Sequence, residues 1–513
     1  MQIKKITIAA FCLALSSAGF SQNTPATTPE LYRPQFHFAP QKNWMNDPNG
    51  LLYYKGVYHM FYQYYPGATV WGPMHWGHAT SKDLFHWKEQ PIALYPDSMG
   101  YIFSGSAVVD FQNSSGFGKD GKIPLVAIFT YHDPEKEKAK RNDFQYQGIA
   151  YSLDEGKSWT KYAGNPVLGN PGITDFRDPK LSWFAAQKKW VMTLATKDRI
   201  TFYASPDLKN WKKLSEFGKD LGGHGGVWEC PDLLPFEYQG KKIWALLVSI
   251  NPGGPNGGSA TQYFLGDFDG TNFIPTDTTT RWIDYGTDNY AGVSFFNTGN
   301  RTIFLGWMSN WQYAQEVPTE KWRSAMTIPR TLHIAQAGGK LYLASIPVDE
   351  IKTIRNKTIN LPDANWKKGL QAAHLANTAG LFQLNFTANA SEDFVILLSN
   401  DAAREVLIGY VASTREFYID RSNSGETNFE KGFGVKHLAP RLATGNSMDI
   451  TLIVDRASVE LFADKGMSVM TEIVFPKKPY NNIRIECKST NSIRKVSYSP
   501  LKPSMQVMPT IPQ

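Results

Sequence analysis

The chain has 513 residues and a formal net charge of +7, and 13% of its residues are aromatic. This length exceeds what one hydrophobic core usually serves, so two or more domains are expected. Lys and Arg form no dense run and charged residues amount to only 19%, which argues against a nucleic-acid-binding protein. The three cysteines are too few and too widely spaced for a disulfide framework or a zinc site.

The N-terminus has the pattern of a secretory signal peptide over residues 1–21. Lys4 and Lys5 precede a short apolar run at 6–20, and small residues follow. Cleavage there predicts an exported protein, periplasmic or extracellular, with a linker at 22–30. A spanning helix needs about 20 apolar residues, and no later segment approaches that length, so no membrane span is expected.

Residues 31–346 contain five similar units. Each begins with a strand that ends in a polar motif, continues through a hairpin and reaches a very apolar strand. The five polar motifs begin at Asn46, Phe103, Phe176, Trp228 and Asn289. Self-similarity at such a period predicts a repeat architecture.

A second motif, Ser-x-Asp-turn-Trp, supports this repeat. It starts at Ser81, Ser152 and Ser205, and a looser copy starts at Gly266, so the copies are 53 to 71 residues apart. The Asp is expected to cap its own turn, and the Trp to pack between neighbouring sheets. Units of this size predict four-stranded blades, and hence a five-bladed β-propeller over 31–346.

The remaining residues have a different pattern. After a linker at 347–360, short strands separated by turns predict a β-sandwich over 361–503, followed by a tail at 504–513. This region carries no cluster of reactive residues, so we expect it to support the propeller or to make accessory sugar contacts. The predicted fold is therefore all-β, a five-bladed β-propeller followed by a C-terminal β-sandwich.

Three of the five polar motifs carry an acid: Asp47, Asp178 and Glu229. The first strand of each propeller blade lines the central channel, so these acids are expected to converge at equivalent positions. Each alone is explained by a turn that the acid caps. Three carboxylates facing one channel repel one another, which costs stability and therefore indicates a functional site.

Paired carboxylates suit glycoside hydrolysis, in which one attacks and the other protonates the leaving oxygen. Glu229 is the expected acid, because the anionic Asp47 and Asp178 would raise its pKa. Asp47 is the expected nucleophile. Arg177 is expected to hold the neighbouring Asp178 ionised and to orient it toward sugar hydroxyls.

Four motifs, at 44–50, 103–107, 176–179 and 228–231, resemble those of glycoside hydrolase family 32, the β-fructofuranosidases. The resemblance extends from Tyr32 to about Leu501 and implies a five-bladed propeller with a β-sandwich. It also implies a retaining hydrolase that removes terminal β-D-fructofuranosyl residues. By this resemblance Asp47 forms a covalent fructosyl-enzyme, Glu229 is the acid/base, and Asp178 stabilises the bound fructose.

The resemblance further implies a set of residues that contact the terminal fructose. These are Trp44, Asn46, Gln63, Trp71, Phe103, Ser104, Arg177 and Trp311. Trp71 and Trp311 are equally compatible with packing between blades, and Phe103 with Ser104 can form a purely structural turn. Gln63 lies in an apolar strand, where a buried amide needs polar partners, which favours a place in the channel.

The segments 61–66 and 70–78 are most similar to those of bacterial levanases and exo-acting fructanases. Levan is therefore the favoured substrate, with inulin or sucrose as further ones. His75 and His78 lack a third metal ligand and no nucleotide-binding loop occurs, so neither a metal nor a cofactor is expected.

Several alternatives stay open at this point. An endo-levanase or a fructosyl-transferase would use the same acids on the same fold. A sialidase-like enzyme would share the turn motif but needs an arginine cluster, and a non-catalytic sugar-binding propeller would keep the aromatic residues. The Gly- and Pro-rich loop at 251–259 is a candidate rim element. Linkage preference and oligomeric state are not determined by these patterns.

Overall fold

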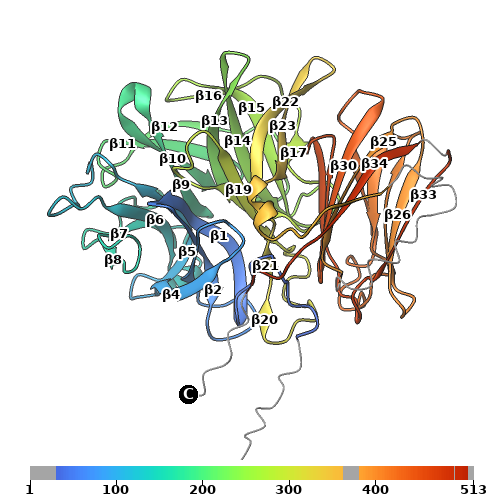
Figure 1. The fold of residues 1–513 in the computed structure, drawn as a ribbon. Helices are drawn as coiled ribbons and strands as arrows, with labels where there is room; N and C mark the ends of the chain where they lie inside the picture. Colours follow the sequence, from blue (N-terminus) through green and yellow to red (C-terminus); the bar gives the residue numbers. More distant parts are fainter. Residues whose placement is uncertain (1–29, 362–379, 490–491, 506–513) are drawn as a thin grey trace, which may run out of the picture. The chain divides into compact units, whose positions relative to one another are not determined.

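The computed structural model describes residues 30–361, 380–489 and 492–505. The predicted signal peptide at 1–21 lies outside these residues. Residues from Tyr32 onward belong to one compact unit. Within the described ranges the structure consists almost entirely of strands, with one short helix, α1 (Pro134–Lys138), and two 3-10 turns, η1 (Ala185–Gln187) and η2 (Asp349–Thr353) (Figure 1). No helix in these ranges is long and apolar enough to cross a membrane.

Residues 43–347 form five antiparallel sheets, one for each predicted unit. The first and second sheets contain β1 (Asn43–Tyr54), β2 (Val57–Tyr65), β3 (His75–Ser81) and β4 (Lys88–Leu94), then β5 (Tyr101–Val109), β6 (Leu125–His132), β7 (Gln145–Ser152) and β8 (Thr160–Lys161). The third contains β9 (Phe176–Phe184), β10 (Lys189–Thr196), β11 (Ile200–Ser205) and β12 (Lys212–Phe217). The fourth contains β13 (Val227–Tyr238), β14 (Lys241–Asn251), β15 (Ala260–Phe268), β16 (Phe273–Pro275) and β17 (Arg281–Trp282). The fifth contains β18 (Tyr290–Ser294), β19 (Thr302–Met308), β21 (Ala325–Met326), β22 (Arg330–Ala337) and β23 (Lys340–Pro347).

The first strands of the five sheets form a closed ring. Strand β1 contacts β5, β5 contacts β9, β9 contacts β13, β13 contacts β18, and β18 contacts β1. The ring is closed further by β20 (Trp322–Arg323), which pairs in parallel with β1, and by a bridge between Leu52 and Phe296. This ring is the propeller arrangement predicted from the repeat, and it brings the heads of all five units together.

Every first strand carries a β-bulge at its polar motif. In each sheet, the pairing advances by three residues along the first strand but by only two residues along the neighbouring strand. The extra residue falls at Asn46–Asp47, Phe103–Ser104, Asp178–Pro179, Cys230–Pro231 and Ala291–Gly292. A bulge leaves a residue unpaired and bends the strand, which accommodates the prolines and turns side chains toward the channel.

This register corrects one expectation about the three acids. Asp47 is the second bulge residue of its strand, Asp178 is the first, and Glu229 comes just before the bulge. Counted from the bulge of its own strand, Glu229 comes first, Asp178 one position later and Asp47 one position later again. The three acids are therefore not at equivalent positions. Asp178 also has a left-handed φ of 64°, as do Cys230 (45°) and Ala291 (52°) at the same place in their own bulges.

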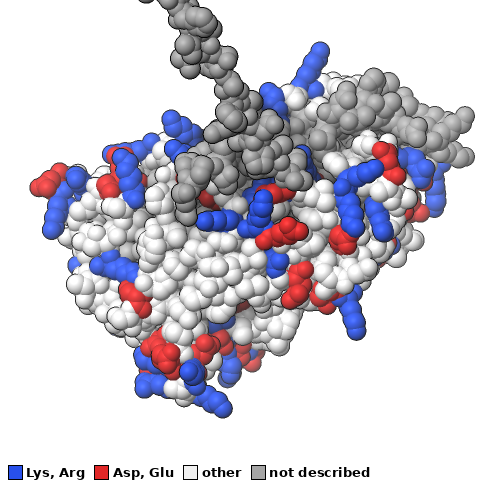
Figure 2. All heavy atoms as spheres, turned by 90° about the horizontal axis from the view of Figure 1, so that it is seen from below, with Lys and Arg blue, Asp and Glu red and all other residues white. Residues whose placement is uncertain are grey.

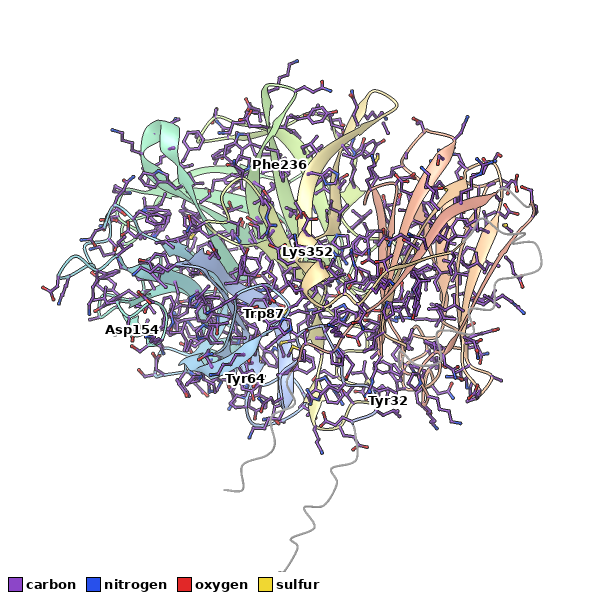
Figure 3. The ribbon with its side chains drawn as sticks, viewed as in Figure 1. Tyr32, Tyr64, Trp87, Asp154, Phe236 and Lys352 are labelled. Atoms are coloured by element: carbon purple, nitrogen blue, oxygen red, sulfur yellow. The ribbon has the colours of Figure 1, made fainter. Side chains whose placement is uncertain are left out.

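The Ser-x-Asp-turn-Trp motif joins the third strand of a sheet to the fourth. In the first copy Asp83 accepts bonds from its own turn, and the Trp87 indole donates to Leu84 O at 2.8 Å. The copies at Asp154 and Asp207 repeat these bonds. Asp154 lies at the outer side of the second sheet (Figure 3), so this motif builds the scaffold and not the channel.

Residues beyond the propeller form two facing sheets around one apolar core. The six-stranded sheet contains β24 (Ile359–Asn360), β25 (Phe382–Asn389), β30 (Ser447–Asp455), β31 (Ser458–Ala463), β32 (Ser468–Ile473) and β34 (Ile493–Pro500). The five-stranded sheet contains β26 (Phe394–Ser399), β27 (Glu405–Val411), β28 (Glu416–Asp420), β29 (Lys436–Pro440) and β33 (Asn482–Cys487). Between propeller and sandwich, Val348, Ile351 and Ile354 are buried in the core, whereas residues 356–360 are exposed.

The propeller and the sandwich pair through their backbones. Tyr285 N–H donates to Val469 O at 2.8 Å, and Asp288 N–H donates to Thr471 O at 3.1 Å. Gly286 lies so close to β32 that a Cβ there would be 2.1 Å from Thr471 N. Only glycine allows this approach, so residues 284–289 run close along β32, the edge strand of the sandwich's six-stranded sheet.

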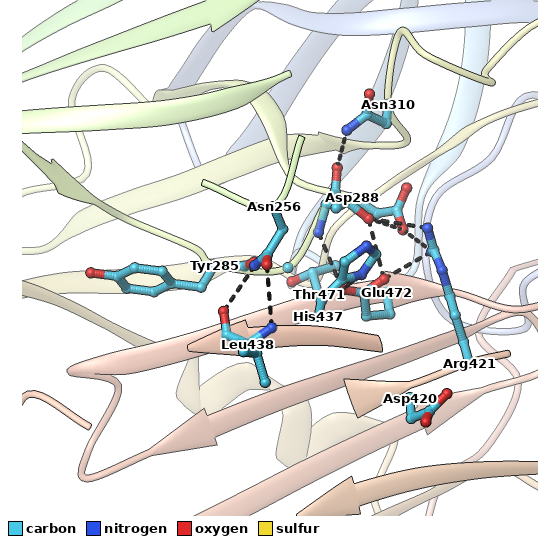
Figure 4. Close-up of polar contacts among 12 residues, drawn as sticks. Asn256, Tyr285, Asp288, Asn310, Asp420, Arg421, His437, Leu438, Thr471 and Glu472 are labelled. Carbon is cyan, nitrogen blue, oxygen red and sulfur yellow. Dashed lines mark hydrogen bonds and ion pairs between the residues drawn. The ribbon is translucent and has the colours of Figure 1, made fainter. Parts of the chain in front are cut away.

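Buried ion pairs reinforce this contact. Arg421 contacts Asp288 at 2.6 Å and Glu472 at 2.8 Å, and His437 contacts Glu472 at 2.8 Å (Figure 4). On the surface, by contrast, acidic and basic side chains are interspersed across the face drawn in Figure 2. Where the two parts meet, by comparison, buried acidic and basic side chains are paired with one another.

His37 belongs to a second buried group, the Arg330 cluster, which consists of His37, Asp284, Arg330, Asp455 and Glu460. Its Nδ1 lies 2.8 Å from Asp455 Oδ2, and its Nε2 lies 2.7 Å from Glu460 Oε1. Burial opposes the charge of His37, but the two carboxylates outweigh it and raise the pKa to about 9. The imidazolium therefore joins the N-terminal segment to β30 and β31.

This raised pKa predicts a pH-dependent stability. The contribution of His37 should be fully present below its unfolded pKa near 6.5 and lost as pH rises through about 9; it amounts to about 3 kcal/mol. The free energy of unfolding of wild type should therefore fall more steeply between about pH 6 and pH 9.5 than that of His37→Gln. His86→Gln, on the surface with 54% of its side chain exposed, is the control. Parallel pH profiles of wild type and His37→Gln would contradict the assignment.

Candidate active site

One pocket of about 240 Å³ opens at the ring of first strands. Ten of the eleven residues predicted from the sequence line it: Asn46, Asp47, Gln63, Trp71, Phe103, Ser104, Arg177, Asp178, Glu229 and Trp311. The bulges explain this convergence, because they turn side chains from separate sheets toward one axis. The three acids thus share a single pocket.

Trp44 is the exception, and the expectation that it contacts the substrate is wrong. Its side chain is 0% exposed and lies beneath Trp311, with ring centroids 5.8 Å apart. The Trp44 indole donates to Asn46 Oδ1 at 2.8 Å. Trp44 therefore orients Asn46 and supports Trp311 from behind the pocket wall.

Asp47 is held by hydrogen-bond donors on both carboxylate oxygens. Asn46 Nδ2 donates to Oδ1 at 3.0 Å, and the Ser104 hydroxyl donates to Oδ2 at 2.6 Å. The Cys230 thiol lies 3.5 Å from the same Oδ2. Burial and then the charge of Glu229 raise the pKa of Asp47, while the Ser104 and Asn46 donors partly offset this rise. These contacts fix the carboxylate in one orientation.

Asp178 shares Cys230 with Asp47. The Cys230 backbone N–H donates to Asp178 Oδ2 at 3.0 Å. Burial raises the pKa of Asp178 to about 7, with Arg177 opposing the rise and the charges of Glu229 and Asp47 adding to it. Arg177 therefore lowers the pKa of Asp178, as expected, but offsets only part of the rise that burial causes.

Arg177 binds Glu229. Its Nε and Nη2 donate to Glu229 Oε1 at 3.1 and 2.9 Å, and its Nη1 donates to Asp175 Oδ1 at 2.5 Å. The Arg177 Nε lies 4.0 Å from Asp178 Oδ2, outside hydrogen-bond range. The guanidinium thus orients Glu229 first and influences Asp178 only through its charge.

Tyr290 is a further partner of Glu229, and it was not predicted from the sequence. Its hydroxyl donates to Glu229 Oε2, and the side chain is buried. Arg177, Glu229 and Tyr290 each stand directly before the bulge of consecutive first strands. Tyr290 also follows directly on the 284–289 segment that pairs with the sandwich, so the interface helps to position this contact.

An aromatic wall faces the acids. Trp311 stacks on Trp44 and lies 4.9 Å from Trp307, while Trp71 meets Phe103 edge to face at 6.1 Å. Trp71 is 37% exposed, which places it at the mouth of the pocket. Flat apolar surface of this kind suits the face of a sugar ring.

The predicted rim loop at 251–259 supports this wall. Trp311 N–H donates to the Ser259 hydroxyl at 3.2 Å. Asn256, earlier in the loop, donates to Tyr285 O and to Leu438 O of the sandwich (Figure 4). The loop is therefore anchored to both parts of the protein.

Five other residues line the pocket but were not predicted: His132, Glu137, Phe144, Gln145 and Asp175. The sequence offered a signal for Asp175 alone, because it precedes Phe176-Arg177 in a recognised motif. The others are His132 at the end of β6, Glu137 on helix α1, Phe144 just before β7 and Gln145 at its start. Nothing in a polar helical turn distinguishes a pocket residue from a surface one, so only the fold identifies them.

Both parts of the chain match models of one protein family. Residues 37–345 match the model of the glycosyl hydrolases family 32 N-terminal domain, and residues 350–501 match that of the family 32 C-terminal domain. The chain is 44% identical to a levanase of Bacillus subtilis over 94% of its own length and 72% of the levanase. It is 39% identical to the extracellular exo-inulinase inuE of Aspergillus niger, covering 94% of this chain and 95% of the inulinase.

Solved structures give the same result. The crystal structure of exo-inulinase from Aspergillus awamori superimposes with a TM-score of 0.83 at 37% identity, over 93% of this chain and 99% of that one. A β-fructofuranosidase from Schwanniomyces occidentalis also gives 0.83, at 34% identity and over 92% and 98% of the two chains. On these matches across both parts of the fold, the chain belongs to glycosyl hydrolase family 32.

Proposed function

We propose that this protein is an exported, exo-acting β-fructofuranosidase that releases terminal fructose from β-fructans, with levan favoured over inulin and sucrose. The observation that carries this proposal is the single pocket in which Asp47, Asp178 and Glu229 face an aromatic wall. Its volume of about 240 Å³ is below the roughly 300–1,000 Å³ of pockets that enclose larger ligands. It therefore suits one terminal sugar. The family assignment disfavours the sialidase-like alternative.

The reaction proceeds with retention in two steps. Asp47 attacks the anomeric carbon of the terminal fructosyl unit while Glu229 gives its proton to the glycosidic oxygen, which breaks the bond to the leaving group. The Glu229 carboxylate then takes a proton from water, and the hydroxide displaces Asp47 from the fructosyl-enzyme. The donors Asn46 and Ser104 hold Asp47 in the attacking orientation.

The other pocket residues bind the fructose. Asp178 accepts hydrogen bonds from fructose hydroxyls and stabilises positive charge that develops on the ring. Gln63, whose amide contacts Asn49 at 2.9 Å and Ile102 O at 3.1 Å, is fixed at the base of the site. The aromatic side chains of the pocket wall, Trp71, Phe103 and Trp311, cover the apolar surface of the fructose ring.

The products formed from levan, inulin and sucrose test this proposal. Purified protein should release fructose alone from the earliest times, fastest from levan, because a pocket for one sugar admits only a chain end. Early oligosaccharides would mean endo cleavage with the same acids, and fructosyl oligomers from concentrated sucrose would mean transfer. No release from any of the three substrates would overturn the proposal and favour a sugar-binding propeller.

A further inference from the structure

Beyond the three acids, the pocket has a polar wall that leads from Glu229 to the solvent. Arg177 contacts Glu229, and its Nη1 donates to Gln145 Oε1 at 3.4 Å. Gln145 Nε2 lies 3.3 Å from His132 Nδ1, and His132 Nε2 lies 3.0 Å from Glu137 Oε2. Glu137 ends this wall with 54% of its side chain exposed.

The direction of these hydrogen bonds can be derived. Gln145 Oε1 accepts from the Phe176 N–H at 2.9 Å and from Arg177, so the Gln145 amide nitrogen is the group that donates to His132 Nδ1. His132 must then carry its proton on Nε2 and donate to Glu137. Burial lowers the pKa of His132, which agrees with this neutral form. The bond from His132 holds the Glu137 carboxylate, and Glu137 lines the pocket.

Helix α1 holds Glu137 at this place. Asp133 caps the helix by accepting from the backbone N–H groups of Glu135 and Lys136, and Pro134 starts it. The His132 ring is clamped by stacking on Phe103 at 4.2 Å. The carboxylate is thus positioned by the fold before any sugar arrives.

We propose that Glu137 binds hydroxyls of the leaving-group sugar, the unit next to the bond that is cleaved, and so makes the enzyme select polyhydroxylated leaving groups. This inference rests on the proposed function. The proton donor Glu229 must lie beside the leaving oxygen, so the leaving sugar exits along the wall that starts at Glu229. A fixed carboxylate is a strong acceptor for sugar hydroxyls.

Two substrates separate this role from a structural one. A fructosyl trisaccharide carries hydroxyls on its leaving group, whereas an aryl β-fructofuranoside does not. In Glu137→Ala the ratio of kcat/KM for the trisaccharide to that for the aryl fructoside should fall about 10-fold, through KM, because one charge-assisted hydrogen bond is lost. Glu137→Gln, which keeps an acceptor for His132, should fall between wild type and Glu137→Ala.

Glu135→Ala is the matched control, because Glu135 lies on the same helix and is absent from the pocket lining; its ratio should equal that of wild type. An unchanged ratio in Glu137→Ala, or equal losses on both substrates, would overturn the inference. Wild type that cleaves neither substrate would instead overturn the proposed function. In that case, calorimetry of trisaccharide binding to Asp47→Asn and to the double variant Asp47→Asn/Glu137→Ala tests the Glu137 contact separately. About 10-fold weaker binding to the double variant supports the contact, and equal affinities refute it.

Discussion

Replacing Asp47 with Asn should lower kcat by roughly four to six orders of magnitude, the range found when a catalytic nucleophile is removed. Asn has almost the same shape but cannot attack the anomeric carbon, so no fructosyl-enzyme forms. The amide keeps only one of the two oxygens, so Asn46 can still donate to it, while the Ser104 hydroxyl must turn to accept from the new amide nitrogen. Steady-state release of fructose from sucrose measures the loss of kcat. The midpoint of denaturant unfolding shows whether the variant still folds as wild type does.

Asp154→Asn makes the same chemical change at an outer turn (Figure 3) and should leave kcat at the wild-type value. Asp47→Ala offers a further check, because a small anion such as azide can fill the space and attack in place of the carboxylate. Azide should then restore cleavage and give the fructosyl azide of inverted configuration. Near-normal turnover in Asp47→Asn would remove Asp47 as the nucleophile.

Replacing Arg330 with Ala should destabilise the protein by about 3–5 kcal/mol, because it removes the cation that pairs with buried Asp284 and leaves His37 as the remaining cation beside buried Glu460. Arg330 is fully buried and contacts Asp284 at 2.8 Å and Glu460 at 2.6 Å. It also donates to the Thr471 hydroxyl of β32 at 2.6 Å, so one side chain ties the propeller to the sandwich. Urea unfolding followed by tryptophan fluorescence measures the loss.

Lys55→Ala is the control for this measurement. Lys55 pairs with Glu155 on the surface, where the two side chains are 60% and 51% exposed, and such pairs contribute little. Arg330→Lys keeps the charge without the fork-shaped contacts, and it should lie between wild type and Arg330→Ala. An unfolding midpoint of Arg330→Ala equal to that of wild type would show that the Arg330 cluster does not hold the interface.

Much of the active site could be predicted because its residues belong to local motifs. Each motif stands at the head of one repeat, and a propeller brings those heads to one axis whatever the loops between them do. Asp47, Asp178 and Glu229 therefore meet in the pocket, together with seven of the eight predicted binding residues. The Asp of the turn motif likewise caps its own backbone, a bond that needs only neighbours in sequence.

The partners of these residues across the ring were not predictable. Arg177 stands beside Asp178 in the sequence, but the bulge turns Asp178 away and leaves Arg177 facing Glu229 on the next strand. Tyr290 reaches Glu229 for the same reason. A one-residue change of register decides which side chains face each other, and the motif itself does not specify that register.

The sequence by itself determined the fold class, the order of the two parts, the family and the acids of the site, because these depend on short motifs and on periodicity. Only the tertiary structure decided that Trp44 is buried behind the wall, that Glu137 reaches the pocket and that Arg330 joins both parts. Each of these facts depends on contacts between residues distant in sequence. Burial and pairing of that kind arise only when the sheets pack.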